Sequence, residues 1–198
     1  MDESTASRLY EGVRKAYSAA AEKPLDRHPF PIGRQFAESI GYPKELLDTL
    51  PEAAMEAFAG VSNVAVFADI PDNSVVLDVG CGSGLDSLIA ARRTGPGGKV
   101  IGVDFSEAML GRARAAAETT GLANVEFIQA AADKVPLPDG SVDIALVNGI
   151  FNLNPKREEL FRELARVVRR GGTVFAAELV LTGPVVPVAQ PTEASWFA

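Results

Sequence analysis

The chain has very few of the side chains that bind transition metals in proteins. Its 198 residues include one cysteine, Cys81, and one histidine, His28. A single cysteine excludes an intramolecular disulfide and a cysteine-cluster metal site, and a zinc site with one histidine would depend on carboxylates. The sequence therefore predicts no metal centre.

Positive charge is also scarce, with 19 Lys and Arg against 26 Asp and Glu and a formal net charge of −7. A nucleic-acid partner would have to be held by a local basic patch against this repulsive field. The sequence shows no charged, apolar leader at its N-terminus, and no uninterrupted apolar run approaches the roughly 18 residues that a membrane span needs. We therefore expect a soluble, cytoplasmic protein with neither a nucleic acid nor a membrane as partner.

Hydrophobic residues, by contrast, make up 47% of the chain, which is enough for one substantial core. From about Val75 onward, short β-rich runs alternate with helical patterns. The β-rich runs cover residues 74–80, 99–105, 125–130, 142–148 and 173–181. Such alternation is typical of a mostly parallel sheet with helices on both faces. The predicted fold class is α/β, with a doubly wound, Rossmann-like sheet.

Two helices are predicted between these runs. In the first, Ser106 is a good N-cap, alanine dominates the interior, and Gly121 can close the C-terminus. In the second, Asn154 is expected to cap the helix, with Pro155 at its first position and Gly171 at its end. The arginines of the second helix are assigned to a solvated face and to the favourable helix C-terminus.

The N-terminal part of the chain predicts a helical cap. Helical stretches at 6–23 and 43–60 are separated by a proline- and glycine-punctuated segment, and residues 61–70 are ambiguous but assigned to helix. The predicted domains are the helical cap at 1–70, a ligand-binding core at 71–181 and an irregular, proline-rich tail at 182–198.

The run DVGCGSG follows the first predicted strand and carries Gly80, Gly82 and Gly84. The dinucleotide-binding fingerprint G-x-G-x-x-G is not met, because Leu85 stands at the position of its third glycine, so NAD is disfavoured. Asp78 lies at the carboxyl end of the strand, where open α/β sheets bind ligands, and its negative charge suits a cationic group.

A second carboxylate, Asp104, ends the second predicted strand. A carboxylate in this position can accept hydrogen bonds from both hydroxyls of a ribose. Together with Asp78 it predicts an adenosyl ligand that carries an amino group and no diphosphate.

The sequence resembles the class I S-adenosylmethionine-dependent methyltransferases in LDVGCGSG, GVDFSEAML, LPDGSVDIALVNGI and ELARVVRRGGTVFAAE, which span about 75–181. The resemblance implies S-adenosylmethionine as the cofactor, the methionine part near Asp78, the ribose at Asp104, and the adenine packed by Phe105 and Met109. One departure is Ala131, which stands where the family often has an acidic residue. The implied cofactor-binding residues are Asp78, Gly80, Cys81, Gly82, Gly84, Asp104, Phe105, Met109, Ala131, Ala132 and Asn148.

Within that family, the sequence resembles the arsenite methyltransferases in three segments, YEGVRKAYSAAA, LDTLPEAAMEAFAGVSN and VNGIFNLNPKREELFREL. Arsenic(III) is thiophilic and is held by several thiolates, but the cysteine positions of that subfamily carry other residues here, such as Val61 and Gly149. We therefore expect a different small-molecule acceptor.

Methyl transfer from a sulfonium is an in-line displacement that needs no acid–base dyad, so no catalytic residue is assigned. Proximity and alignment elsewhere contribute about 7–11 kcal/mol to such a step. The acceptor is expected beyond the end of the fourth strand, with contacts from amide and apolar side chains. These candidate acceptor contacts are Asn148, Phe151 and Asn152. The aromatic residues for which core or lid packing is the expected role are Tyr10, Tyr17 and Trp196.

Two alternatives remain open from the sequence. The first is a degenerate module that binds S-adenosylmethionine or S-adenosylhomocysteine and acts through a partner; the second is a nicotinamide oxidoreductase, which the glycine spacing opposes. A sheet of the resembled type normally adds two more strands, and the few residues after Leu181 do not suffice for them. We expect a chain truncated after the fifth strand, with a homodimer as another way to cover the bare edge.

Overall fold

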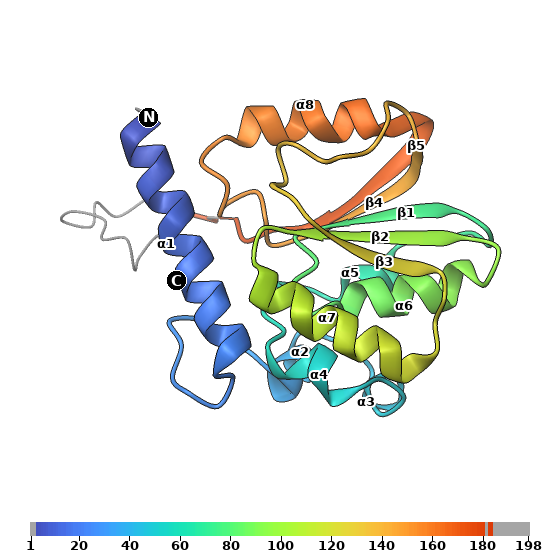
Figure 1. Cartoon of the computed structure of the whole chain (residues 1–198), viewed down its shortest axis with the longest axis horizontal. Helices are drawn as coiled ribbons and strands as arrows, with labels where there is room; N and C mark the ends of the chain where they lie inside the picture. Colours follow the sequence, from blue (N-terminus) through green and yellow to red (C-terminus); the bar gives the residue numbers. More distant parts are fainter. Residues whose placement is uncertain (1–2, 181, 184–198) are drawn as a thin grey trace.

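A parallel β-sheet forms the centre of the computed structural model, which describes residues 3–180 and 182–183 (Figure 1). Its strands are β1 (Val75–Val79), β2 (Lys99–Asp104), β3 (Val125–Gln129), β4 (Val142–Asn148) and β5 (Val168–Ala177). The strand order is β3-β2-β1-β4-β5, and every pairing is parallel. This arrangement confirms the predicted α/β fold class. The order of the strands in the chain reverses between β1 and β4, which creates a crevice at their carboxyl ends.

The two faces of the sheet are covered by different helices, as the alternation of side chains along a strand requires. Val76 and Ile144 belong to the core shared with α5 (Val64–Phe67) and α6 (Leu85–Thr94). Leu77 and Ala145, their neighbours in sequence, belong to the core on the face of α8 (Arg157–Val167). Figure 1 shows α8 above the sheet and α5, α6 and α7 (Glu107–Thr120) below it.

The helix α7 has the predicted ends. The Ser106 hydroxyl accepts a hydrogen bond from the Met109 amide at 3.3 Å, and Gly121 closes the helix in a left-handed conformation with φ of 68°.

The predicted ends of α8 are wrong. The helix begins at Arg157, because the Asn154 side chain instead accepts a hydrogen bond from the Lys156 amide at 2.8 Å in the preceding turn. It stops at Val167, because Val168 is already extended and begins β5. Gly171 lies inside β5, where the register with β4 is irregular, and its φ of 78° suits a glycine.

The N-terminal region contains α1 (Glu3–Glu22), α2 (Arg34–Ser39), α3 (Lys44–Leu47) and α4 (Glu52–Glu56). The single helix predicted over 43–60 is therefore wrong. Pro51 is extended at the start of α4, with φ of −62° and ψ of 141°, and a proline disfavours helix in the residue before it. Helix α2 was not predicted, whereas the helical assignment within 61–70 is confirmed by α5.

Helix α1 lies beside the carboxyl ends of the strands, at the left of Figure 1. Its second half is attached to the α7 region: the Ser18 and Ser106 hydroxyls are 2.8 Å apart, and Arg112 donates to the Ala21 carbonyl. Arg112 also pairs with Glu56 of α4 at 2.5 Å. These contacts fix α1 over the crevice.

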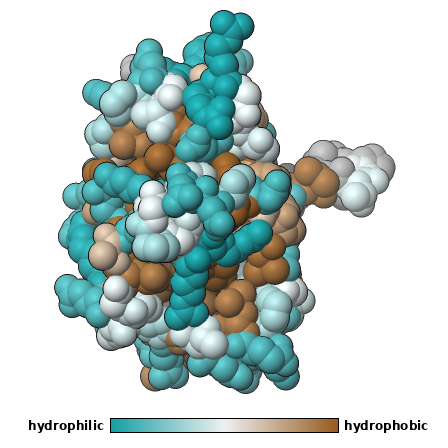
Figure 2. Space-filling model, turned by 90° about the vertical axis from the view of Figure 1, so that its right-hand side faces the viewer, coloured by the Kyte–Doolittle hydropathy of each residue, from teal (hydrophilic) through white to brown (hydrophobic). Residues whose placement is uncertain are grey.

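Figure 2 shows the end of the molecule that faces away from α1, where hydrophilic side chains are interspersed with smaller apolar areas. Across residues 3–180 and 182–183, no helix combines the length and the apolar character that crossing a bilayer requires. The predicted domain boundaries, the tail and the homodimer stay predictions.

Candidate functional site

A cavity lies at the carboxyl ends of β1, β2 and β4, where the strand order reverses. Helix α1 and residues 57–60 also contribute to its walls. Each of the three strand ends contributes side chains or backbone to it, namely Asp78 and Gly80, Asp104 and Phe105, and Asn148 and Gly149. This is the position in which open α/β sheets bind ligands.

The glycine loop is bent tightly enough to bring two backbone amides to one acceptor. The amides of Gly80 and Cys81 both donate to the Val103 carbonyl, at 2.8 and 3.0 Å. Gly80 has φ of 69°, and a Cβ added there would lie 2.2 Å from Cδ1 of Ile150. Both the backbone conformation and the space therefore require glycine.

Asp104 connects the glycine loop to the start of α7. Its two carboxylate oxygens accept hydrogen bonds from the Gly82 amide at 2.9 Å and the Ser106 amide at 2.8 Å. Burial raises the pKa of Asp104 to about 6, although the hydrogen bonds from Ser106 and Gly82 oppose the shift. The carboxylate is thus held rigidly at the cavity wall.

Asp78 is buried at the end of β1, and the Ser87 hydroxyl donates to it at 2.6 Å. Burial, and then the neighbouring carboxylate of Asp86, raise the pKa of Asp78. Among the described residues that line the cavity, none is Lys, Arg or His. A cationic ligand group would therefore stabilise the ionised form of Asp78. No cluster of three or more potential metal-ligating side chains occurs within the described part of the chain.

A third carboxylate, Asp86, also lines the cavity and was not among the predicted site residues. It accepts hydrogen bonds from the Tyr42 hydroxyl at 2.6 Å, the Asn148 amide group at 2.8 Å and the Ala65 amide at 3.2 Å. Burial raises its pKa, and the hydrogen bonds from Tyr42 and Asn148 lower it. The signal for it in the sequence was an acidic residue in the first turn of the helix that follows the glycine loop.

Asn148 lines the cavity, but the rest of the protein already engages its side chain. Its oxygen accepts from the Val61 and Ser62 amides at 2.8 and 3.2 Å, and its nitrogen donates to the Ser62 carbonyl at 2.7 Å. A Cβ added at Gly60 would lie 2.6 Å from that nitrogen. Asn148 therefore fixes the backbone of residues 60–62 against the end of β4.

Most of the predicted cofactor residues meet at this cavity. Those that line it are Asp78, Gly80, Cys81, Gly82, Asp104, Phe105, Met109, Ala132 and Asn148. Gly84 and Ala131 are not among the lining residues. A Cβ added at Gly84 would lie 2.9 Å from Cβ of Ala113, so this glycine allows close packing of α6 on α7.

The predicted acceptor contacts are divided. Phe151 and Asn152 are not among the residues that line the cavity. The Phe151 ring stacks on Phe161 with centroids 4.7 Å apart, and the Asn152 side chain donates to the Leu179 carbonyl at 2.6 Å. Tyr10 and Tyr17 of α1 do line the cavity, which the sequence had not favoured, whereas Trp196 lies outside the described residues.

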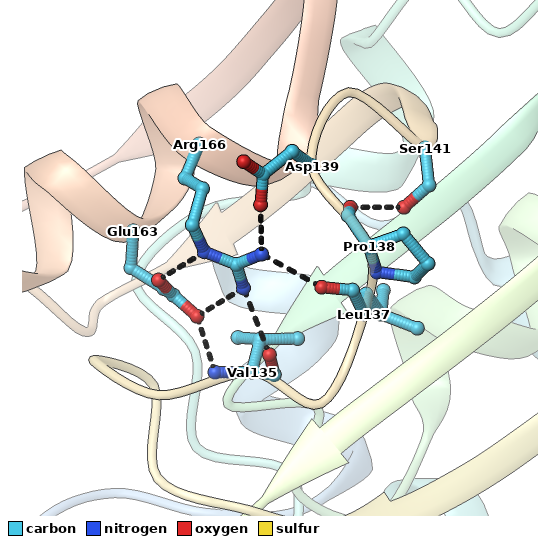
Figure 3. Close-up of polar contacts among 7 residues, drawn as sticks. All are labelled: Val135, Leu137, Pro138, Asp139, Ser141, Glu163 and Arg166. Carbon is cyan, nitrogen blue, oxygen red and sulfur yellow. Dashed lines mark hydrogen bonds and ion pairs between the residues drawn. The ribbon is translucent and has the colours of Figure 1, made fainter.

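The connection from β3 to β4, which begins with the cavity residues Ala130 and Ala132, is fastened to α8 by Arg166 (Figure 3). Arg166 donates to the Leu137 and Val135 carbonyls at 2.8 and 3.0 Å. It also pairs with Glu163 and Asp139, each at 2.7 Å. The predicted place of this arginine in the last turn of the helix is confirmed, but its partly buried side chain is engaged with the connection and does not lie on a solvated face.

Comparison with known proteins gives a consistent result. A family model described as a methyltransferase domain matches residues 70–194. Arsenite methyltransferase from Halobacterium salinarum is 34% identical over 148 residues, which are 75% of this chain and 38% of that protein. Demethylmenaquinone methyltransferase from Listeria welshimeri is 41% identical over 98 residues, which are 49% of this chain and 41% of that protein.

A solved structure agrees with these relatives. The arsenic(III) S-adenosylmethionine methyltransferase from Chlamydomonas reinhardtii superimposes with a TM-score of 0.57 and 28% sequence identity, over 73% of this chain and 48% of that chain. The chain spans less than half of the length of these curated relatives. Because the family model matches more than half of the chain, and the superposition on a solved S-adenosylmethionine methyltransferase agrees with it, the chain belongs to the class I S-adenosylmethionine-dependent methyltransferases.

Proposed function

We propose that this protein transfers the methyl group of S-adenosylmethionine to a small, uncharged acceptor by in-line displacement. The observation that carries the proposal is a cavity with buried carboxylates at two adjacent strand ends, Asp78 and Asp104, joined by a glycine loop. The degenerate binding module gains no support, because the relatives of this chain are named as methyltransferases.

The residues present fit the cofactor. Asp78 has no cationic partner in the cavity, so the amino group of the methionine part would compensate its buried charge. Asp104 would accept from the ribose hydroxyls, and Phe105 with Met109 would pack against the adenine. We call the region of these four residues the cofactor half of the cavity. When bound, S-adenosylmethionine supplies a methyl group attached to a sulfonium, and the thioether that departs needs no protonation.

Residues 59–60 and 148–150 line another part of the cavity, which we call its acceptor half. The described residues that line the cavity include no Lys, Arg or His, so nothing there would pair with an anionic acceptor. The proton that a neutral thiol or phenol loses would pass to water or to one of the carboxylates that line the cavity, Asp78, Asp86 or Asp104, as the methyl group is transferred to the acceptor. The protein would hold it in line and exclude water, and the glycine loop and Asn148 fix the walls that do so.

Arsenite is a poor fit for this acceptor half. A Cβ added at Gly149 would lie 3.0 Å from Cγ1 of Val61, so the two positions expected to carry cysteines in arsenite methyltransferases lie side by side without a thiol. Cys81 is buried, and burial with the charges of Asp104 and Asp78 raises the pKa of its thiol well above the ordinary value. A protonated thiol is a weak ligand for arsenic(III).

Calorimetric titration with S-adenosylmethionine and S-adenosylhomocysteine tests the cofactor site. We expect both to bind, and Asp104→Ala to weaken both by about a hundredfold, because a charged hydrogen-bond acceptor is lost from a buried site. Equal affinity in the variant would overturn the assignment of the site. Glu107→Ala, which removes an exposed acid at the start of α7, is the matched control and should bind as the parent does.

The acceptor class is tested by S-adenosylhomocysteine formation with a panel of neutral thiols and phenols, carboxylates, and arsenite. Turnover with neutral nucleophiles alone would support the proposal. Turnover confined to carboxylates or arsenite would contradict the assigned class while leaving the cofactor site intact.

A further inference from the structure

The Tyr10 hydroxyl is unusual among the described residues. Among the buried side-chain nitrogen and oxygen atoms of these residues, it alone has no hydrogen-bond partner. Buried hydroxyls in native proteins are nearly always hydrogen-bonded, and an unpaired one destabilises the fold. An orphaned polar atom on the wall of a ligand cavity indicates a partner that arrives with the ligand.

The surroundings of Tyr10 say which part of a ligand it would meet. Tyr10 lines the cavity from α1, and its ring centroid is 5.4 Å from that of Phe105, at the end of β2. Burial, followed by the charges of Asp133 and Asp104, raises the pKa of Tyr10 to about 12. The hydroxyl therefore keeps its proton at neutral pH and acts as a hydrogen-bond donor.

We propose that the Tyr10 hydroxyl donates a hydrogen bond to a ribose hydroxyl of the bound cofactor, so that α1 closes the cofactor half of the cavity from above. The inference rests on the proposed function. A ribose hydroxyl both donates and accepts, so it can donate to Asp104 and accept from Tyr10 at the same time. Each Asp104 oxygen accepts one backbone amide, from Gly82 or Ser106, and keeps a second acceptor site for a ribose hydroxyl.

The way in which α1 is attached indicates that the hydrogen bond of Tyr10 would form only when the cofactor is bound. The second half of α1 is fastened in the free protein by Ser18 against Ser106 and by Arg112 on the Ala21 carbonyl. Tyr10 lies two turns before Ser18, where its ring packs against that of Phe105. The cofactor would thus supply the hydrogen bond that the Tyr10 hydroxyl lacks in the free protein.

The test is Tyr10→Phe, which removes the hydroxyl and keeps the ring on Phe105. We expect the melting temperature of the ligand-free protein to stay the same or rise, because an unpaired buried hydroxyl is removed. We expect the affinity for S-adenosylhomocysteine, measured by calorimetry, to fall about three- to tenfold, as for the loss of one neutral hydrogen bond.

Ser18→Ala is the matched control, because it removes a hydroxyl of the same helix that is already paired in the free protein. This variant should lower the melting temperature of the ligand-free protein and change the ligand affinity less than Tyr10→Phe does. The opposite pattern, in which Tyr10→Phe lowers the free melting temperature and leaves the affinity unchanged, would overturn the proposal by showing a structural role.

A double-mutant cycle with 2′-deoxy and 3′-deoxy analogues of S-adenosylhomocysteine assigns the partner atom. If Tyr10 donates to one ribose hydroxyl, Tyr10→Phe costs no further affinity for the analogue that lacks it. Full additivity with both analogues would contradict the ribose assignment. If the parent chain binds no S-adenosylhomocysteine, the proposed function itself fails; if it binds and Tyr10→Phe binds equally well, only the role of Tyr10 fails.

Discussion

The two halves of the cavity are built in different ways. The cofactor half comes from short, contiguous segments, in which Asp78, Gly80 and Gly82 lie within five residues and Asp104 follows at the next strand end. The acceptor half depends on Asn148, which joins the end of β4 to residues 61 and 62, more than eighty positions away in the chain. Local sequence therefore specifies the first half, and long-range packing specifies the second.

The largest expected effect is on the glycine loop of the cofactor half. Gly80→Ala should destabilise the protein by roughly 3–5 kcal/mol, because a left-handed backbone conformation is strained by a side chain and the new Cβ overlaps Ile150. Urea denaturation measures the loss. Ile150→Ala in the same chain should recover the part due to overlap; a Gly80→Ala variant as stable as the parent would show that the loop is not fixed as described.

The next largest effect is on the pH dependence of protein stability, and it again involves the cofactor half. The buried Asp104 carboxyl has its pKa raised from 3.8 to about 6, so between these values the folded protein holds a proton that the unfolded chain releases. The contribution of this proton to the free energy of unfolding is fully present below about pH 4. It is lost as the pH rises through 6, by roughly 3 kcal/mol in total at about 1.4 kcal/mol per pH unit. Asp78, whose pKa is also raised, extends the decline to higher pH.

Denaturation at several pH values between 4 and 8 measures this decline. Asp143 and Glu163 have lowered pKa values, so their opposite contribution lies below about pH 4.5, at the edge of this window. Asp104→Asn cannot titrate and should show a shallower decline than the parent. Parallel curves for the two proteins would rule out titration of Asp104 as the cause.

Asn148→Ala tests whether the two halves of the cavity are independent of each other. This change leaves the Val61 and Ser62 amides and one Asp86 oxygen without their partner, so we expect a loss of stability of about 2–3 kcal/mol. The acceptor half should loosen while S-adenosylhomocysteine still binds within about threefold of the parent affinity, because Asp78 and Asp104 are untouched. If cofactor affinity falls as steeply as turnover, the two halves are not separate units.

The smallest effect is expected at the wall formed by the connection from β3 to β4. Arg166→Ala removes the donor to the Val135 and Leu137 carbonyls and should cost about 1–2 kcal/mol. Arg162→Ala, on the same helix, breaks only an exposed pair with Glu158 and should cost less than about 0.5 kcal/mol. Similar losses for both arginines would show that Arg166 does not hold this connection.

Sequence patterns alone predicted the α/β class, the first four strands, the existence of a fifth and the ends of α7, since each depends on local periodicity and capping. They also identified Asp78, Asp104 and most of the glycine loop, because strand ends and tight turns have local signatures. They failed where distant contacts compete with local preference: Val168 leaves α8 to pair in the sheet, and Pro51 divides a stretch that is otherwise helical in pattern.

The contacts of the polar side chains around the cavity, by contrast, depend on the packed fold. Asp86 and Asn148 form hydrogen bonds with α5, with Tyr42 and with the loop after α4. Phe151 and Asn152, by contrast, do not line the cavity. The packed fold also leaves the Tyr10 hydroxyl buried without a partner. The physical reason is that a hydrogen bond requires a defined distance and direction between two atoms, and for residues far apart in the chain only the packed fold sets both.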